Sequence, residues 1–138
     1  EIGKAINMAE EGEGLFITTG VMTQLALEAS EMLASEGIQC GVLHVHTIKP
    51  LDDFNIIKSV ESAKAVITVE EHTRIGGLGS AVLEILSDKS PKSAFKVKRI
   101  GIPDKFADQY GNQNSLLGHW DISVPDLCKA MKTKLNLK

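Results

Sequence analysis

The sequence predicts an α/β fold, a three-layer α/β/α sandwich around a mostly parallel sheet of about five strands, with one antiparallel strand near the start. Short apolar segments of strand character alternate with longer segments whose apolar residues recur every three or four positions. Residues 65–70 are almost all apolar, which is typical of a strand covered on both faces. Alternation of this kind requires crossover connections, and these place helices on both faces of a parallel sheet.

The first predicted strands are residues 4–8 and 15–19, and the short, glycine-containing connection between them suits an antiparallel pair. A helix is expected over residues 21–36, where Gly37 can end it. Its apolar residues recur at helical spacing at Met22, Leu25, Ala29, Met32 and Leu33. These three segments predict the first half of the sandwich.

The middle of the chain continues the alternation of strands and helices. A strand over residues 39–46 is followed by Pro50, and Asp52 is expected to cap the next helix. The apolar strand 65–70 then leads, through a glycine-rich turn, into a helix that opens with Gly79 and ends near Asp88.

The last third supplies an edge strand and a terminal helix. In residues 94–102 apolar and basic residues alternate, which predicts one wet face and an edge position. Residues 104–120 are expected to form a polar loop with a short helix around Leu116. In the terminal helix, Ser123 and Asp126 have the spacing of a capping box.

Composition restricts the class of protein. At 138 residues the chain is expected to form a single domain over residues 1–138, and 43% hydrophobic with 24% charged residues suits a globular domain. A net charge of −3 argues against a nucleic-acid partner, which requires a concentrated basic surface. No apolar run approaches the roughly 20 residues of a membrane span, so no membrane partner is expected. Cys40 and Cys128 are expected to be reduced and buried, which fits a cytoplasmic location.

The segment 67–81 carries the strongest functional signal. It reads as a buried strand that ends in two carboxylates and an imidazole and then turns through glycines into a helix. Ligands and partners of α/β sheets meet the carboxyl ends of strands and the N-termini of helices. The candidate residues for an anion or partner contact are therefore Arg74, Gly76, Gly77, Gly79 and Ser80. Glu70, Glu71 and His72 are candidate interface residues.

The same segment does not fit known nucleotide motifs. Gly77-Leu78-Gly79 begins a dinucleotide fingerprint, but Val82 stands where glycine or alanine is needed, and no Gly-Lys-Ser/Thr follows. The favoured interpretation is a tight strand-to-helix turn whose glycines permit a positive φ and close packing, and the anion or partner contact is the alternative. Glu70 and Glu71 would point to opposite faces of a strand, so they are not expected to form an acid–base pair. No catalytic residue is expected in this chain.

Cys40, His44 and His46 fall on one face of their predicted strand, which is a combination that zinc could use. No fourth ligand and no closely spaced ligand pair accompanies them, so structural histidines and a core thiol are favoured, and no metal site is expected. Tyr110 and Trp120 are isolated and are expected to pack a C-terminal flap rather than stack on a ligand.

Several motifs together resemble one family. They are HTIKPLD at 46–52, VEEH at 69–72, GGLGSAV at 76–82 and RIGIPD at 99–104, with further matches in EIGKA at 1–5 and TTG at 18–20. In this order and spacing they are similar to the C-terminal domain of transketolase and its thiamine-diphosphate relatives, over the whole chain. The resemblance implies the three-layer fold with one antiparallel strand.

The resemblance also implies what the complete enzyme does. Its family transfers two-carbon ketol units between sugar phosphates, in the manner of the pentose phosphate pathway, with thiamine diphosphate and magnesium bound by other domains. The cofactor motifs of those domains, a Gly-Asp-Gly…Asn metal pattern and a pyrimidine-domain glutamate, have no counterpart here. The implied partners are the thiamine-binding domains, in the same chain or a separate subunit, and a second copy in a homodimer.

Alternatives remain at this point. One is the corresponding domain of 1-deoxyxylulose-5-phosphate synthase or of a 2-oxoacid dehydrogenase beta subunit, and another is a stand-alone anion-binding module. The chain opens without methionine and with a segment that already looks like a strand, which predicts an excised domain or a fragment of a longer chain.

Overall fold

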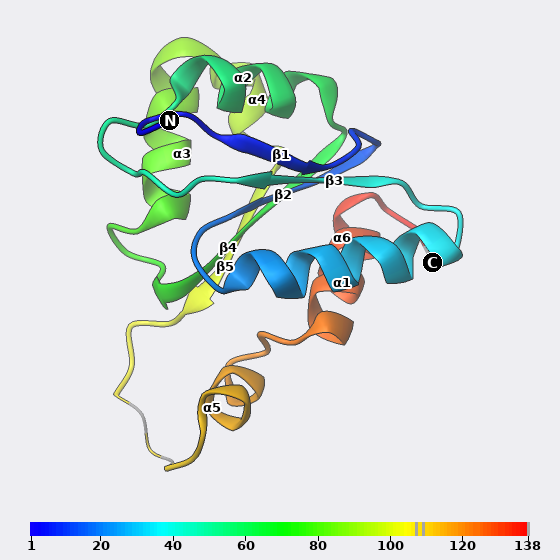
Figure 1. Cartoon of the computed structure of the whole chain (residues 1–138), viewed down its shortest axis with the longest axis vertical. Helices are drawn as coiled ribbons and strands as arrows, with labels where there is room; N and C mark the ends of the chain where they lie inside the picture. The colour runs from blue at the N-terminus through cyan, green and yellow to red at the C-terminus, as the bar shows by residue number, and fades with distance from the viewer. Residues whose placement is uncertain (107, 109, 138) are drawn as a thin grey trace.

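In the computed structural model, which describes residues 1–106, 108 and 110–137, a five-stranded sheet lies between two layers of helices (Figure 1). The strands are β1 (Ile6–Ala9), β2 (Gly14–Thr18), β3 (Cys40–His44), β4 (Ala65–Thr73) and β5 (Val97–Ile102). The helices are α1 (Met22–Ser35), α2 (Asp53–Ser62), α3 (Leu78–Lys89), α4 (Pro91–Ala94), α5 (Gln113–His119) and α6 (Val124–Lys134). The predicted fold class is confirmed.

The sheet has the order β1-β3-β2-β4-β5, in which only β1 is antiparallel to its neighbour. The predicted hairpin between the first two strands is wrong, because β1 pairs with β3 instead. Both edges of β2 are already taken, since Phe16 pairs with Val42 of β3 and with Ile67 of β4. β5 occupies the edge, as its alternating sequence predicted.

Each face of the sheet has its own hydrophobic core. Phe16 and Ile67 pack toward α1 and α6, whereas Leu15, Ile17 and Val66 pack toward α2 and α3. Figure 1 shows these two pairs of helices on opposite sides of the sheet, with α5 standing away from the main body. The all-apolar character of β2 and of the first part of β4 follows from this burial on both faces.

Both cysteines are free and buried in the α1–α6 core. Burial, with smaller effects of the Glu13 and Cys128 charges, raises the pKa of the Cys40 thiol to about 12. Burial likewise raises the pKa of Cys128. The two thiols are therefore protonated at neutral pH and are poor nucleophiles.

Two element boundaries differ from the prediction. β4 continues through Glu71 and His72 to Thr73, with a register shift against β5 after Val69. The predicted strand over 94–102 begins at Val97, because Pro91 starts the short helix α4 just before it. The first change lies at the carboxyl end of β4, where the candidate site is, and the second lies at the amino end of β5.

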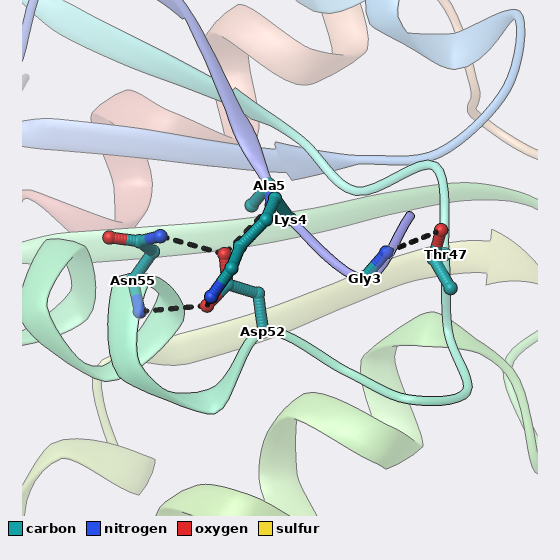
Figure 2. A network of polar contacts seen from close by, with 6 residues as sticks. All are labelled: Gly3, Lys4, Ala5, Thr47, Asp52 and Asn55. Atoms are coloured by element: carbon teal, nitrogen blue, oxygen red, sulfur yellow. Dashed lines mark hydrogen bonds and ion pairs between the residues drawn. The ribbon is translucent and has the colours of Figure 1, made fainter. Parts of the chain in front are cut away.

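Asp52 ties the N-terminal segment to the start of α2 (Figure 2). Its carboxylate accepts hydrogen bonds from Asn55 N (3.4 Å), Asn55 Nδ2 (2.7 Å) and Ala5 N (2.9 Å), and Lys4 Nζ lies 4.0 Å away. The predicted helix cap is confirmed. The residue is only 4% exposed, so these partners replace water.

Asp52→Asn is expected to reduce the loss of unfolding free energy that the domain shows as the pH falls into the acid range. Burial acts to raise the pKa of Asp52, but the hydrogen bonds from Asn55 and Ala5, with the Lys4 charge, lower it below its ordinary value of 3.8. The pKa of Asp52 is lower in the folded state than in the unfolded state, so the ionised carboxylate stabilises the fold at pH values above the unfolded-state pKa. This stabilisation is lost as the pH falls through the folded-state pKa. The variant should also lose about 1 kcal/mol at pH 7, because one of the two acceptor oxygens becomes an NH2 group that faces N–H donors.

Urea unfolding at pH 7 and pH 3 measures both effects. Asp104→Asn, at an exposed residue, is the matched control and should keep the wild-type pH dependence. A variant at Asp52 whose stability falls with acid as steeply as that of the wild type contradicts the assignment.

Candidate functional site

The junction between β4 and α3 is built around the buried carboxylate of Glu70. Its side chain accepts hydrogen bonds from Leu78 N (2.7 Å, to Oε2) and Gly79 N (3.0 Å, to Oε1), and the residue is 1% exposed. Gly77 holds the cap position of α3 and has no side chain to offer. The strand that precedes the helix therefore supplies the acceptor for the first helical N–H groups, and its negative charge lies at the positive end of the helix dipole.

The glycines of the junction allow this close approach. A Cβ atom on Gly77 would overlap Glu70 Oε2 and lie 2.7 Å from the carboxyl carbon. One on Gly79 would lie 2.7 Å from Thr68 Oγ1 and 2.8 Å from Arg99 Cδ. Gly76 has a φ of +76°, which suits glycine. The interpretation of this segment as a tight strand-to-helix turn is confirmed.

The loop before α3 is held by Ser80 and Arg99. The Arg74 carbonyl accepts hydrogen bonds from Ser80 Oγ (3.0 Å) and from Arg99 Nη1 (2.8 Å), and Gly76 N donates to Ser80 Oγ (3.1 Å). The Arg74 side chain is exposed. Sequence reasoning missed Arg99 as part of this site, because its position beside the loop depends on the pairing of β5 with β4.

Glu71 and His72 lie on the part of β4 that extends past the core. Glu71 is exposed, on the face opposite Glu70, and accepts hydrogen bonds of 2.7 and 2.8 Å from Gln113 Nε2 of α5. The ring of the exposed His72 contacts the Thr73 carbonyl at 2.9 Å through Nδ1. The expectation that Glu70 and Glu71 point apart is thus confirmed.

His44 ends a short chain of polar side chains at the carboxyl end of the sheet. Its Nδ1 lies 2.7 Å from Thr23 Oγ1, which lies 2.9 Å from Thr18 Oγ1, and the His44 and His46 ring centres are 5.9 Å apart. Burial, and then the neighbouring His46, lowers the pKa of His44, so the ring is neutral at pH 7. Within the described residues there is no group of three or more His, Cys, Asp or Glu side chains arranged to hold a metal ion. The contact with Thr23 of α1 could not be read from the spacing within one strand.

Comparison with known proteins decides the family. The family model described as "Transketolase, C-terminal domain" matches residues 3–126. The chain belongs to this family. Of the solved structures, "Split gene transketolase, inactive beta4 tetramer" is similar with a TM-score of 0.88 and 36% identity, over 100% of this chain and 44% of that one. A transketolase from Campylobacter jejuni shares the fold, with a TM-score of 0.65 at 17% identity over 95% of this chain and 18% of that one.

Curated relatives of this transketolase C-terminal domain are larger proteins. The "1-deoxy-D-xylulose-5-phosphate synthase" of Syntrophotalea carbinolica is 36% identical over 131 residues, which are 95% of this chain and 20% of the relative. An apulose-4-phosphate transketolase subunit of Phocaeicola vulgatus is 37% identical over 128 residues, which are 93% of this chain and 39% of the relative. The chain therefore spans well under half of the length of these relatives.

The transketolase C-terminal domain exposes apolar side chains beside the junction and in the segment after β5. The exposed fractions are 63% for Ile75, 100% for Phe106 and 104% for Tyr110. The expectation that Tyr110 packs a flap is wrong, whereas Trp120 is half-buried against the α1–α6 core, with its ring edge-on to His119 at 4.6 Å. No helix in the described part of the chain is long and apolar enough to cross a bilayer.

Proposed function

We propose that this domain is the non-catalytic C-terminal part of a cytoplasmic thiamine-diphosphate enzyme that transfers two-carbon ketol units between sugar phosphates. The observation that carries the proposal is the family match over residues 3–126, together with relatives in which the matched segment is a minor part. Thiamine diphosphate and magnesium would be held by other domains, in the same chain or a separate subunit.

A structural role for this domain is supported by how its acid–base side chains are used. Glu70 caps α3, Glu71 accepts from Gln113, and His44 contacts Thr23. A general acid or base must be within reach of a substrate proton and have a pKa suited to transfer. These three groups are instead engaged in contacts within the domain.

The surface at the carboxyl end of β4 is the proposed contact with the thiamine-binding domains or a second copy. It comprises the exposed Glu71, His72 and Arg74, with Ile75 between the strand and the glycine turn. Gly76, Gly77, Gly79 and Ser80 set the shape of this surface through the turn that they form. Glu70 contributes from beneath it, by fixing the start of α3. Apolar side chains exposed beside polar ones are typical of such interfaces.

The chain by itself is expected to show neither ketol transfer nor saturable binding of thiamine diphosphate. Calorimetric titration with thiamine diphosphate and magnesium, and a transfer assay with sugar phosphates, measure the two properties. Clear affinity or turnover by the chain would contradict the proposal. The enzyme restored with its thiamine-binding domains provides the positive control.

The contact surface can be tested with two matched substitutions in that restored enzyme. Ile75→Lys should weaken association of the domains by at least about tenfold, because it buries a charge in the interface. Phe54→Lys, at a residue of α2 that is 75% exposed, should change association by less than about twofold. Equal effects of the two variants would remove Ile75 from the interface.

A second candidate activity is that of 1-deoxy-D-xylulose-5-phosphate synthase. It is favoured by a relative of that name that matches 95% of this chain at 36% identity. Assaying the restored enzyme for formation of 1-deoxy-D-xylulose 5-phosphate, in parallel with ketol transfer between sugar phosphates, separates the two activities. Product in only one of the assays identifies the enzyme.

A further inference from the structure

A basic cavity lies at the free edge of the sheet, against β5 and α6, and it reaches Arg74 and Arg99 beside the loop before α3. It has a volume of about 460 Å³. The cationic side chains that line it are Arg74, Lys98, Arg99, Lys105 and Lys129. The wall also contains two carboxylates, Asp121 and Asp126, and the imidazole of His119. This is a local excess of positive charge on a chain whose net charge is −3.

Some of the ionisable side chains in the wall already have a hydrogen-bond or ion-pair partner within the domain, and others have none among the described ion pairs. Asp126 is hydrogen-bonded to Ser123 at the start of α6, and His119 is paired with Asp108 at 3.2 Å. The ion pairs found among the described residues involve neither Lys98 nor Lys129. These two exposed lysines face no carboxylate in an ion pair there, so their charge is open to an anionic ligand.

The edge of β5 adds hydrogen-bond donors to the same wall. Lys96 O accepts from Val66 N, and Ile102 O accepts from Arg74 N, so the even-numbered residues of β5 face β4. Because backbone groups alternate along a strand, Arg99 and Gly101 direct their N–H groups to the free edge. β5 is the last strand of the sheet, and both residues line the cavity. Backbone N–H groups beside lysines form a suitable wall for a phosphate group.

A second, apolar cavity of about 450 Å³ adjoins the basic one. Its apolar lining is Ile102, Leu116, Leu117 and Trp120, and it shares Lys105 and Trp120 with the basic cavity. Glu71 and Gln113, which are hydrogen-bonded to each other, complete its wall. Each cavity is within the size range of small-molecule sites, about 300–1,000 Å³. A ligand that fills both must combine an anionic end with an apolar body.

We propose that the two cavities form one binding site for a small phosphate ester that carries an apolar or aromatic group. The phosphate lies against Lys98, Lys129 and the edge of β5, and the apolar group lies against Leu116 and Trp120. The site consists of residues of this domain alone, so the proposal does not depend on the reaction proposed for the complete enzyme.

Phenyl phosphate and inorganic phosphate are the probes. Trp120 is the single tryptophan of the chain and lines both cavities, so its fluorescence reports binding directly. Phenyl phosphate should bind saturably and at least about tenfold more tightly than inorganic phosphate, because only the ester also buries apolar area. Calorimetry on the same samples checks the stoichiometry of one ligand per chain.

Matched variants assign the two ends of the site. Lys98→Ala with Lys129→Ala should weaken phenyl phosphate binding by about tenfold, since two charge-assisted contacts are lost. The control is Lys58→Ala with Lys92→Ala, which changes the net charge equally at exposed lysines outside both cavities. This control should weaken phenyl phosphate binding by less than about twofold. Leu116→Ser should weaken binding of phenyl phosphate but leave that of inorganic phosphate unchanged.

Three results would overturn the proposal. They are the absence of saturable binding of phenyl phosphate at low ionic strength, equal losses in the two double variants, and equal affinity for the two probes. Urea unfolding of each variant is compared with the wild type first. If Leu116→Ser destabilises the domain, Leu116→Ala replaces it in the same comparison.

Discussion

Glu70→Ala is expected to lower the free energy of unfolding by about 3–4 kcal/mol, a large effect for one side chain in a domain of this size. The substitution removes the acceptor of two buried N–H groups, those of Leu78 and Gly79. It also removes a negative charge from the N-terminus of α3 and leaves a void beneath Gly77. Each of these changes lowers the free energy of unfolding.

Glu70→Gln separates the charge from the shape of the side chain. An amide has one oxygen and one NH2 group, so at least one of the two helical N–H groups then meets a donor. The expected loss is about 2 kcal/mol, smaller than that of the alanine variant. Equilibrium unfolding in urea measures both losses.

Glu71→Ala is the matched control for Glu70. The adjacent carboxylate is exposed, and its hydrogen bonds to Gln113 are at the surface, so its loss should cost less than about 1 kcal/mol. Similar losses for the two alanine variants would show that the carboxylate of Glu70 does not stabilise the start of α3.

Gly77→Ala is expected to destabilise the domain by about 3 kcal/mol, although its φ of −93° is accessible to alanine. The added methyl group would overlap the Glu70 carboxylate. That carboxylate cannot move aside without losing its bonds to Leu78 N and Gly79 N. The cost therefore has a steric origin and is transmitted through the helix cap.

A double-mutant cycle tests this origin. In a Glu70→Ala background the Gly77→Ala substitution should cost less than about 1 kcal/mol, because the obstructing carboxylate is absent. Gly118→Ala is the control, since a Cβ atom there meets nothing within 4 Å and a helical glycine gains stability on replacement. Additive losses at Glu70 and Gly77 would contradict the proposed contact between them.

Local signals in the sequence predicted most of the elements. Asp52 and Ser123 start their helices as expected, because a cap depends on residues within one turn. The opposite orientation of Glu70 and Glu71 follows from the alternation of a strand, which needs no tertiary information. The edge position of β5 was visible in its alternating lysines.

The remaining features depend on contacts between distant segments. The partner of β1 could not be predicted, because a short glycine turn permits a hairpin but does not exclude the insertion of β3 between the strands. The buried role of Glu70 depends on β4 extending to Thr73 before the chain turns back. Arg99 reaches the loop before α3 only because β5 pairs with β4, which no local pattern encodes.

The capped start of α3 has a consequence for how the domain depends on small molecules. In many α/β proteins the N–H groups that follow such a glycine turn are satisfied by a bound phosphate, so the fold gains stability as that ligand is supplied. Here the Glu70 carboxylate is the built-in substitute, at a fixed position within the chain. At this junction the folding equilibrium is therefore independent of ligand concentration, and the domain can be complete before the rest of an enzyme has bound its cofactor.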